Sequence, residues 1–322
     1  MAHRPVRFTA LILFAVLLAS THASAQSFGL LRTRRVVPLR NSGSDVVAAY
    51  FNADDELDLA VAVSETSVAV VRGNGDGTFL PPVYYSMGDQ AECIAAGDFY
   101  EDGHTDFVVG DYGGNIQVFI NSGSGIFTGY SVSADNGKVF ALAAEDLTGD
   151  GHVDLVAGGR TEVGSDGYVQ IYHGTGGGTF IGPFNTYYFD YQCNTICFGD
   201  FNGDGLRDIA ATVEDPGDVA ILLNNGDSTY EGPFLFDVDE YTYSLAVADF
   251  NEDGNDDFAA GTEYSHAQVF LGNGDGTFMP KVTYDMQDYV YSLDVADFNE
   301  DGHIDLVGST TTSFIDVLLG NG

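Results

Sequence analysis

One nine-residue stretch, Asp200 to Asp208, most constrains what this chain can fold into. It places oxygen-bearing side chains at positions 1, 3, 5 and 9 and a glycine at position 6. Alternating oxygen side chains in a tight loop suit a hard cation such as Ca²⁺, which takes about six to eight oxygen ligands. The glycine supplies the left-handed backbone that such a turn needs. The stretch therefore predicts a calcium-binding loop.

The same loop, or a degraded copy of it, occurs six times along the chain. Successive first positions lie 48, 48, 54, 49 and 48 residues apart, at Tyr50, Asp98, Asp146, Asp200, Asp249 and Asp297. A repeat of this length indicates a propeller or a solenoid. Six such repeats occupy nearly all of the chain that follows its first 25 residues.

Each repeat contains short apolar segments in the same order around the loop. In the fifth repeat they are residues 243–248 before the loop, 258–260 after it, 269–271, and a segment through Val282 and Tyr284. A Gly-Asn-Gly-Asp-Gly turn block at 272–278 separates the last two segments and recurs at 73–79 and, loosened, at 174–180. Four antiparallel strands per repeat, joined by tight turns, predict an all-β propeller with six blades.

The two ends of the repeat array predict how the ring closes. The chain stops at 319–322, where the fourth strand of the sixth repeat would begin, and residues 28–39 match that missing strand. An N-terminal strand that completes the last blade removes two open sheet edges. Seven blades are the alternative if the sequence is a piece of a longer array.

The first 25 residues have the pattern of a secretory signal peptide. A basic start is followed by an apolar run of 12 residues, Phe8 to Ala19, and by Ala23-Ser24-Ala25. We expect cleavage near Ala25–Gln26 and a secreted, extracellular or periplasmic protein with one propeller domain at 26–322. The apolar run is too short to span a bilayer, so no membrane insertion is predicted.

Charge and cysteine content narrow the classes of partner and of cross-link. The 48 acidic residues against 11 basic ones exclude nucleic acid as a partner on electrostatic grounds. Cys93, Cys193 and Cys197 cannot all pair, and the last two lie too far apart along one expected strand for a disulfide. We therefore predict free, buried thiols.

With its loop, turn block and period, the chain resembles the FG-GAP/VCBS repeat family, which includes the calcium-binding propeller of integrin α subunits and many secreted bacterial proteins. The resemblance implies that each loop joins the first two strands of a blade. It also implies calcium ligation by side chains 1, 3, 5 and 9 and by the carbonyl at position 7. The implied ligands of the four best loops are Asp200, Asn202, Asp204, Leu206 and Asp208; Asp249, Asn251, Asp253, Asn255 and Asp257; Asp297, Asn299, Asp301, His303 and Asp305; and Asp146, Thr148, Asp150, His152 and Asp154.

Two loops depart from the family pattern. The second keeps Asp98, Asp102, His104 and Asp106 as ligands but has Tyr100 at position 3, so weaker binding or completion by water is expected. The first has Tyr50 at position 1 and Asp55 in place of the glycine, and it is expected to hold no metal. About four to five structural calcium sites are therefore predicted.

The rim opposite the loops is where the repeats vary most. It carries aromatic and acidic residues, which either bind a partner or pack between blades: Tyr187, Tyr188, Phe189, Asp190, Tyr191, Asp237, Asp239, Glu240, Tyr241, Asp285, Asp288 and Tyr289. The favoured interpretation is an adhesion or interaction module for extracellular carbohydrate or protein, of undetermined oligomeric state. The alternative is a lectin or a polysaccharide-active lyase or hydrolase. Because no catalytic constellation is found, we expect no enzyme activity.

Overall fold

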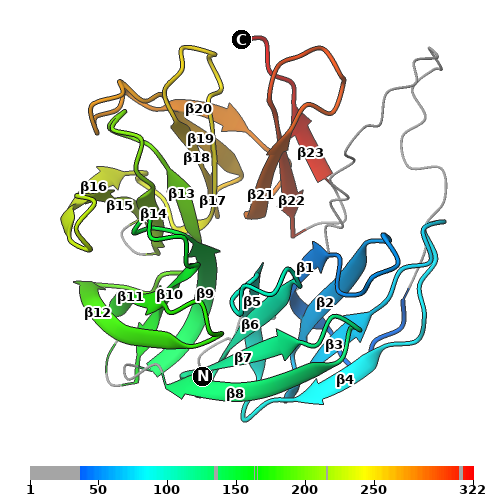
Figure 1. The fold of residues 1–322 in the computed structure, drawn as a ribbon. Helices are drawn as coiled ribbons and strands as arrows, with labels where there is room; N and C mark the ends of the chain where they lie inside the picture. Colours follow the sequence, from blue (N-terminus) through cyan, green and yellow to red (C-terminus); the bar gives the residue numbers. More distant parts are fainter. Residues whose placement is uncertain (1–36, 134–136, 163, 165, 215–216, 312–314) are drawn as a thin grey trace.

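A computed structural model describes residues 37–133, 137–162, 164, 166–214, 217–311 and 315–322. Within these ranges the regular elements are β-strands, gathered into six antiparallel sheets around a common axis (Figure 1). The predicted all-β, six-bladed propeller is confirmed, and the count is six rather than seven. The predicted signal peptide, residues 1–25, lies outside the described residues.

The strands follow one another in sequence from the inside of each blade to its outside. The first strand of every blade lies nearest the axis (Figure 1). The blades consist of β1 (Gly43–Ala49), β2 (Asp58–Val63), β3 (Ser67–Val71) and β4 (Val83–Ser86); β5 (Ala91–Gly97), β6 (Asp106–Asp111), β7 (Asn115–Asn121) and β8 (Phe127–Ser133); β9 (Gly137–Glu145), β10 (Asp154–Thr161), β11 (Gly167–Gly174) and β12 (Phe180–Phe189); β13 (Ile196–Gly199), β14 (Asp208–Val213), β15 (Asp218–Asn224) and β16 (Tyr230–Asp237); β17 (Thr242–Ala248), β18 (Asp257–Thr262), β19 (His266–Phe270) and β20 (Val282–Asp285); and β21 (Val290–Ala296), β22 (Asp305–Thr310) and β23 (Ile315–Leu318).

Most of the hydrophobic core lies between neighbouring blades. The second strand of a blade is buried on both faces, as in β2, whose six residues are all buried. A strand that is covered on both faces needs apolar residues at every position, which explains the continuous apolar sequence from Leu59 to Val63. Among the described residues, five of the six core clusters combine residues of two neighbouring blades; Phe107 and Val109 of the second blade, for example, pack with Val68 and Val70 of the first. The sixth cluster lies on the first blade.

The second position of most loops anchors the loop in this core. Phe51, Phe99, Leu147 and Phe201 are buried there. The ring of Phe201 lies 5.7 Å from that of Phe278, in the turn block of the next blade, and the Phe278 ring lies 4.8 Å from Phe258. The apolar residue at the second position therefore joins each of these loops to the following blade.

The predicted closing strand, residues 28–39, is described only from Val37 onward. Residues 37–39 form no strand, and Val37 and Leu39 pack on the face of the first blade that carries Leu59 and Val61. The Arg40 amide donates a hydrogen bond to the Tyr84 hydroxyl at 2.9 Å. The sixth sheet has three strands among the described residues, so closure by residues 28–36 stays a prediction.

The three cysteines are free, as predicted, but two of them do not share a strand. Cys193 precedes β13, because the amides of Asn194 and Thr195 donate to the Thr212 hydroxyl rather than to a neighbouring strand. Burial raises the pKa of Cys193 and of Cys197 to about 12. Thiols in such surroundings stay protonated and pack as small apolar groups.

Candidate calcium loops and the opposite rim

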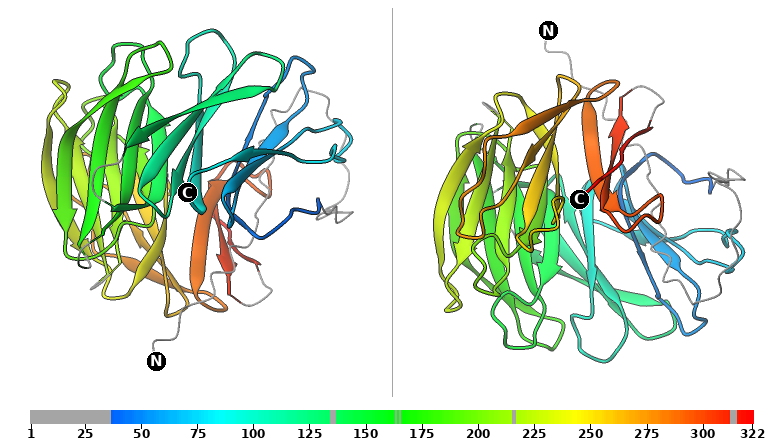
Figure 2. Two further views of the ribbon diagram at one scale, coloured as in Figure 1. Left: turned by 90° about the horizontal axis from the view of Figure 1, so that it is seen from below. Right: turned by 90° about the horizontal axis from the view of Figure 1, so that it is seen from above.

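All six acidic loops lie at one rim of the ring, because each connects the first strand of a blade to the second. Seen from two further directions in Figure 2, the strands run between this acidic rim and an opposite rim. The carboxylate at loop position 9 is fully buried in every blade: Asp58, Asp106, Asp154, Asp208, Asp257 and Asp305. The last residue of each acidic loop therefore lies in the interior of the protein.

The position-9 carboxylate ties the loop to the third strand of its own blade. Asp208 Oδ2 accepts a hydrogen bond from the Phe201 amide at 2.9 Å, and Oδ1 accepts one from the Asn224 amide at 2.7 Å. Burial raises the pKa of Asp208 to about 6, although these amide bonds oppose the shift. Asp257 behaves alike, with its pKa raised to about 6. Desolvation of a carboxylate destabilises its charged form, which nearby positive charge would restore.

The remaining predicted ligands of the loop bind its own backbone. Asp200 accepts from the amides of Asp204 and Gly205, at 3.1 and 2.9 Å, and Asp204 accepts from Leu206 at 2.9 Å. The same bonds recur in the loops that begin at Asp249 and Asp297. Among the described residues, no three His, Cys, Asp or Glu side chains lie together as a preformed metal-binding group.

The third loop provides a direct test of whether these residues fit a cation. The Thr148 hydroxyl, at the predicted ligand position 3, is buried and has no hydrogen-bond partner within the described structure. A buried, unsatisfied oxygen is costly and calls for a partner. A hard cation held by Asp146, Thr148, Asp150 and Asp154 would provide one, so the oxygen-rich donor set fits calcium.

The two degraded loops differ from the others in the way the sequence indicates. Tyr50 is 49% exposed and Tyr100 is 51% exposed, and neither phenol replaces the missing oxygen ligand. In the first loop the Asn52 amide donates to Asp58 Oδ2 at 3.0 Å. Asp55 adopts the left-handed conformation, with φ of 59°, where the other five loops have glycine.

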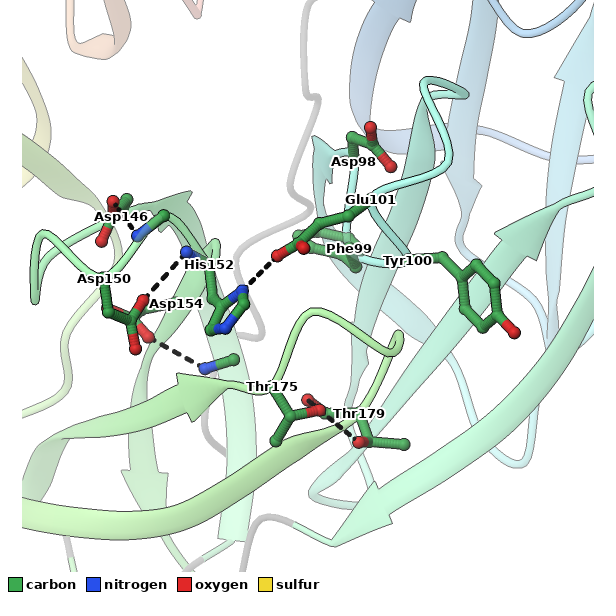
Figure 3. A network of polar contacts seen from close by, with 12 residues as sticks. Asp98, Phe99, Tyr100, Glu101, Asp146, Asp150, His152, Asp154, Thr175 and Thr179 are labelled. Atoms are coloured by element: carbon green, nitrogen blue, oxygen red, sulfur yellow. Dashed lines mark hydrogen bonds and ion pairs between the residues drawn. The ribbon is translucent and has the colours of Figure 1, made fainter.

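Side chains at loop positions 4 and 7 join consecutive loops. Glu101, at position 4 of the second loop, hydrogen-bonds with Nδ1 of His152, at position 7 of the third (Figure 3). Glu252 and His303 repeat the contact at 2.5 Å between the fifth and sixth loops. The resemblance to the family implied a role only for the carbonyl oxygen at position 7, so this role of the histidine side chain was missed. The signal was present, because glutamate is followed 51 residues later by histidine in both pairs.

At the opposite rim, the first strands of five blades contain a β-bulge at one repeat position. The residue left out of the ladder is Ser44, Glu92, Phe140, Tyr243 or Tyr291. A bulge bends the strand and re-aims the side chain of the extra residue. We call this side of the molecule the tyrosine rim. It lies at the far end of the first strand from the acidic loop, about 20 Å away for a strand of seven residues.

At the fifth and sixth blades, the tyrosine rim carries a group of neighbouring aromatic residues. The rings of Tyr243 and Tyr291 lie 5.2 Å apart, and the Tyr243 hydroxyl donates to Glu263 at 3.3 Å. Tyr264 is 57% exposed and Tyr289 is 42% exposed. Of the aromatic residues predicted at this rim, Tyr188 and Tyr191 are also exposed. Phe189 is buried in the core cluster between the third and fourth blades, and the partly buried Tyr187 packs against that cluster.

A family model described as an FG-GAP-like repeat matches residues 50–109, 98–157, 146–211, 200–260 and 249–308. Each match runs from one acidic loop past the next, so the matched unit is the loop with the strands around it. The chain belongs to the FG-GAP-like repeat family. No curated protein sequence matches it.

Solved structures similar to this FG-GAP-like chain share its fold at low sequence identity. The BP39L lectin from Burkholderia pseudomallei has a TM-score of 0.67 and 13% identity, over 86% of this chain and 82% of that one. A lectin from Agrocybe aegerita has 0.55 and 20%, over 82% and 73%. BBS1N, solved in complex with ARL6DN, has 0.62 and 13%, over 88% and 81%.

Among the described residues of this FG-GAP-like propeller, no helix has the length and apolar character needed to cross a membrane.

The bulged residues of the tyrosine rim were not predicted from the sequence. Their spacing of 48 residues, within the first three blades and again from Tyr243 to Tyr291, is nevertheless visible there.

Proposed function

We propose that this chain is a secreted, calcium-stabilised propeller that acts as an adhesion or interaction module for an extracellular carbohydrate or protein. The observation that carries the proposal is the division between the two rims. At the acidic rim the loop side chains bind the loop backbone and the next blade. At the tyrosine rim, aromatic side chains such as Tyr264 and Tyr188 face solvent. Exposed aromatic residues beside polar groups are typical of recognition surfaces.

Calcium has a structural role in this proposal. The carboxylate-rich loops would hold it through the predicted ligands, and its charge would offset the mutual repulsion of carboxylates such as Asp200, Asp204 and Asp208. These residues already shape the loop by accepting its amide hydrogen bonds, and Asp208 links it to the core. A metal that binds the folded loop alone raises the free energy of unfolding.

The comparisons support an interaction role of either kind. Two of the similar structures are lectins, one of them described by its recognition of non-reducing terminal N-acetylglucosamine, and BBS1N was solved with a protein partner. Several described histidines are engaged in pairs with glutamate, as in His152 with Glu101 and His266 with Glu240.

The test uses the chain from residue 26 to 322 in millimolar calcium. We expect binding either on a glycan array or to an extracellular protein, without release of product from polysaccharide substrates. Loss of binding after substitution of tyrosine-rim residues, with an unchanged melting temperature, would place recognition at that rim. Product release from a polysaccharide would instead identify an enzyme, and the absence of any ligand in both screens would contradict the interaction role.

A further inference from the structure

The tyrosine rim gathers one cluster of π faces and carboxylates between the fifth and sixth blades. We define the tyrosine–glutamate cluster as Tyr243, Glu263, Tyr264, Tyr289 and Tyr291. We propose that this cluster binds a cationic side chain, namely an arginine presented by a basic peptide segment of a partner. The inference rests on the proposed interaction role and adds the place of binding and the class of ligand.

The residues of the cluster come from two neighbouring blades, the fifth and the sixth. The bulges of β17 and β21 present Tyr243 and Tyr291, whose rings lie 5.2 Å apart. The turn between β18 and β19 presents Glu263, which accepts the Tyr243 hydroxyl at 3.3 Å, and Tyr264. Residues before β21 present Tyr289. Because the ring pair and the hydrogen bond restrain these side chains, little order has to be gained when a ligand binds.

The electrostatic character of the cluster is negative. The charge of Glu263 raises the pKa of Tyr264, with Tyr289 and Glu240 acting in the same direction. Glu240 is paired with His266 at 2.8 Å, and within the described residues neither Glu240 nor Glu263 has a lysine or arginine partner. Tyrosine faces and a carboxylate together attract ammonium and guanidinium groups. The net charge of −37 would steer a basic ligand toward the protein.

The second and third blades show how this rim accommodates a cation. There, Lys138 Nζ lies 3.7 Å from the ring centroid of Tyr112. Tyr112 and Glu263 occupy the same position of the repeat. Tyr112 follows Asp111, which pairs with Ala91 at the start of β5, and Glu263 follows Thr262, which pairs with Thr242 at the start of β17. Lys138 and Tyr289 both lie eight residues before the first position of their loops, Asp146 and Asp297. At the equivalent place in blades five and six, an aromatic ring thus replaces the chain's own cation, and a carboxylate replaces the ring that the cation contacts.

The experiment measures binding of a blocked tripeptide, acetyl-Gly-Arg-Gly-amide, to the 26–322 chain in millimolar calcium. Tyrosine fluorescence reports binding because the chain has no tryptophan. We expect a saturable change with the arginine peptide, and about tenfold weaker binding of the peptide that carries the neutral isostere citrulline. Glu263→Gln and Tyr291→Leu should each weaken arginine binding about fivefold.

The matched control is Glu92→Gln, which removes one charge from the same rim at the bulge of the second blade. It should leave arginine binding unchanged, whereas Tyr291→Phe should retain most of it. Equal binding of the citrulline peptide, or equal weakening by Glu92→Gln and Glu263→Gln, would overturn the proposal. If cluster variants abolish binding of a glycan while arginine does not compete, the cluster is a saccharide site; this inference then fails and the interaction role stands.

Discussion

The carboxylate of Asp45 in the first blade accepts a hydrogen bond from the backbone amide of Ile94 in the second, over 3.0 Å. Its other oxygen accepts from the Val46 amide at 2.8 Å. Burial nevertheless raises the pKa of Asp45 to about 6 from 3.8. The folded state therefore holds this proton more tightly than the unfolded state does. The contribution of Asp45 to stability is most favourable below pH 3.8 and declines as the pH rises through 6.

Asp45→Asn should stabilise the protein at neutral pH, because the amide cannot ionise, while its single oxygen keeps one of the two backbone hydrogen bonds that the carboxylate accepts. We expect the free energy of unfolding to rise by about 1–2 kcal/mol at neutral pH and to change little near pH 4. Urea unfolding of the variant and the wild type at both pH values measures the difference. An effect of equal size at the two pH values would show that ionisation of Asp45 is not its cause.

Calcium should raise the melting temperature of the chelated protein. Each occupied loop is expected to add about 1–2 kcal/mol at millimolar calcium, if its affinity is that of an extracellular module. Asp204→Asn should remove part of this gain, since it weakens a loop with all of its predicted ligands. Asp54→Asn, in the loop expected to hold no metal, is the matched control and should leave the gain intact. Differential scanning calorimetry with and without calcium measures both; an unchanged melting temperature would refute calcium binding.

Gly205→Ala should destabilise the chelated protein through backbone strain alone. Gly205 has φ of +84°, and a Cβ there would meet no atom within 4 Å. The cost is therefore that of the left-handed conformation, about 1 kcal/mol. Gly177→Ala, outside the left-handed region and in contact only with the Thr175 hydroxyl at 3.9 Å, should be neutral or stabilising. Equal unfolding free energies for the two variants would contradict this account.

The acidic loops were predictable because their chemistry is local. Asp200 to Asp208 carries its ligands, its turn glycine and its apolar anchor Phe201 within nine residues, and the repeat supplied the blade count. Contacts between blades were not predicted: the 51-residue spacing of Glu101 and His152 is visible in the sequence, but whether the two side chains meet depends on how two blades are placed side by side. The bulge at Tyr243 was also missed, because an apolar segment does not show which of its residues leaves the ladder.

Glu101→Ala should weaken calcium binding by the following loop, although it removes none of that loop's ligands. The reason is that Glu101 restrains His152, whose carbonyl is a predicted ligand (Figure 3). Glu300→Ala changes the same loop position in the last blade, and it should have no such effect on the third loop. Calcium titrations followed by calorimetry compare the two variants. Identical titration curves for Glu101→Ala and the wild type would mean that the loops bind independently.

Thr212→Val should destabilise the fourth blade, because the buried Thr212 hydroxyl accepts the amides of Asn194 and Thr195 at 2.9 and 3.0 Å. Valine keeps the shape of threonine but leaves both part-buried amides without this acceptor. We expect a loss of about 2 kcal/mol in the free energy of unfolding. Thr212→Ser keeps the hydroxyl and loses one methyl group, and it should cost about 1 kcal/mol or less. Denaturant unfolding of both variants decides the matter: a serine variant that is less stable than the valine variant would show that packing, rather than the shared hydroxyl, fixes the start of β13.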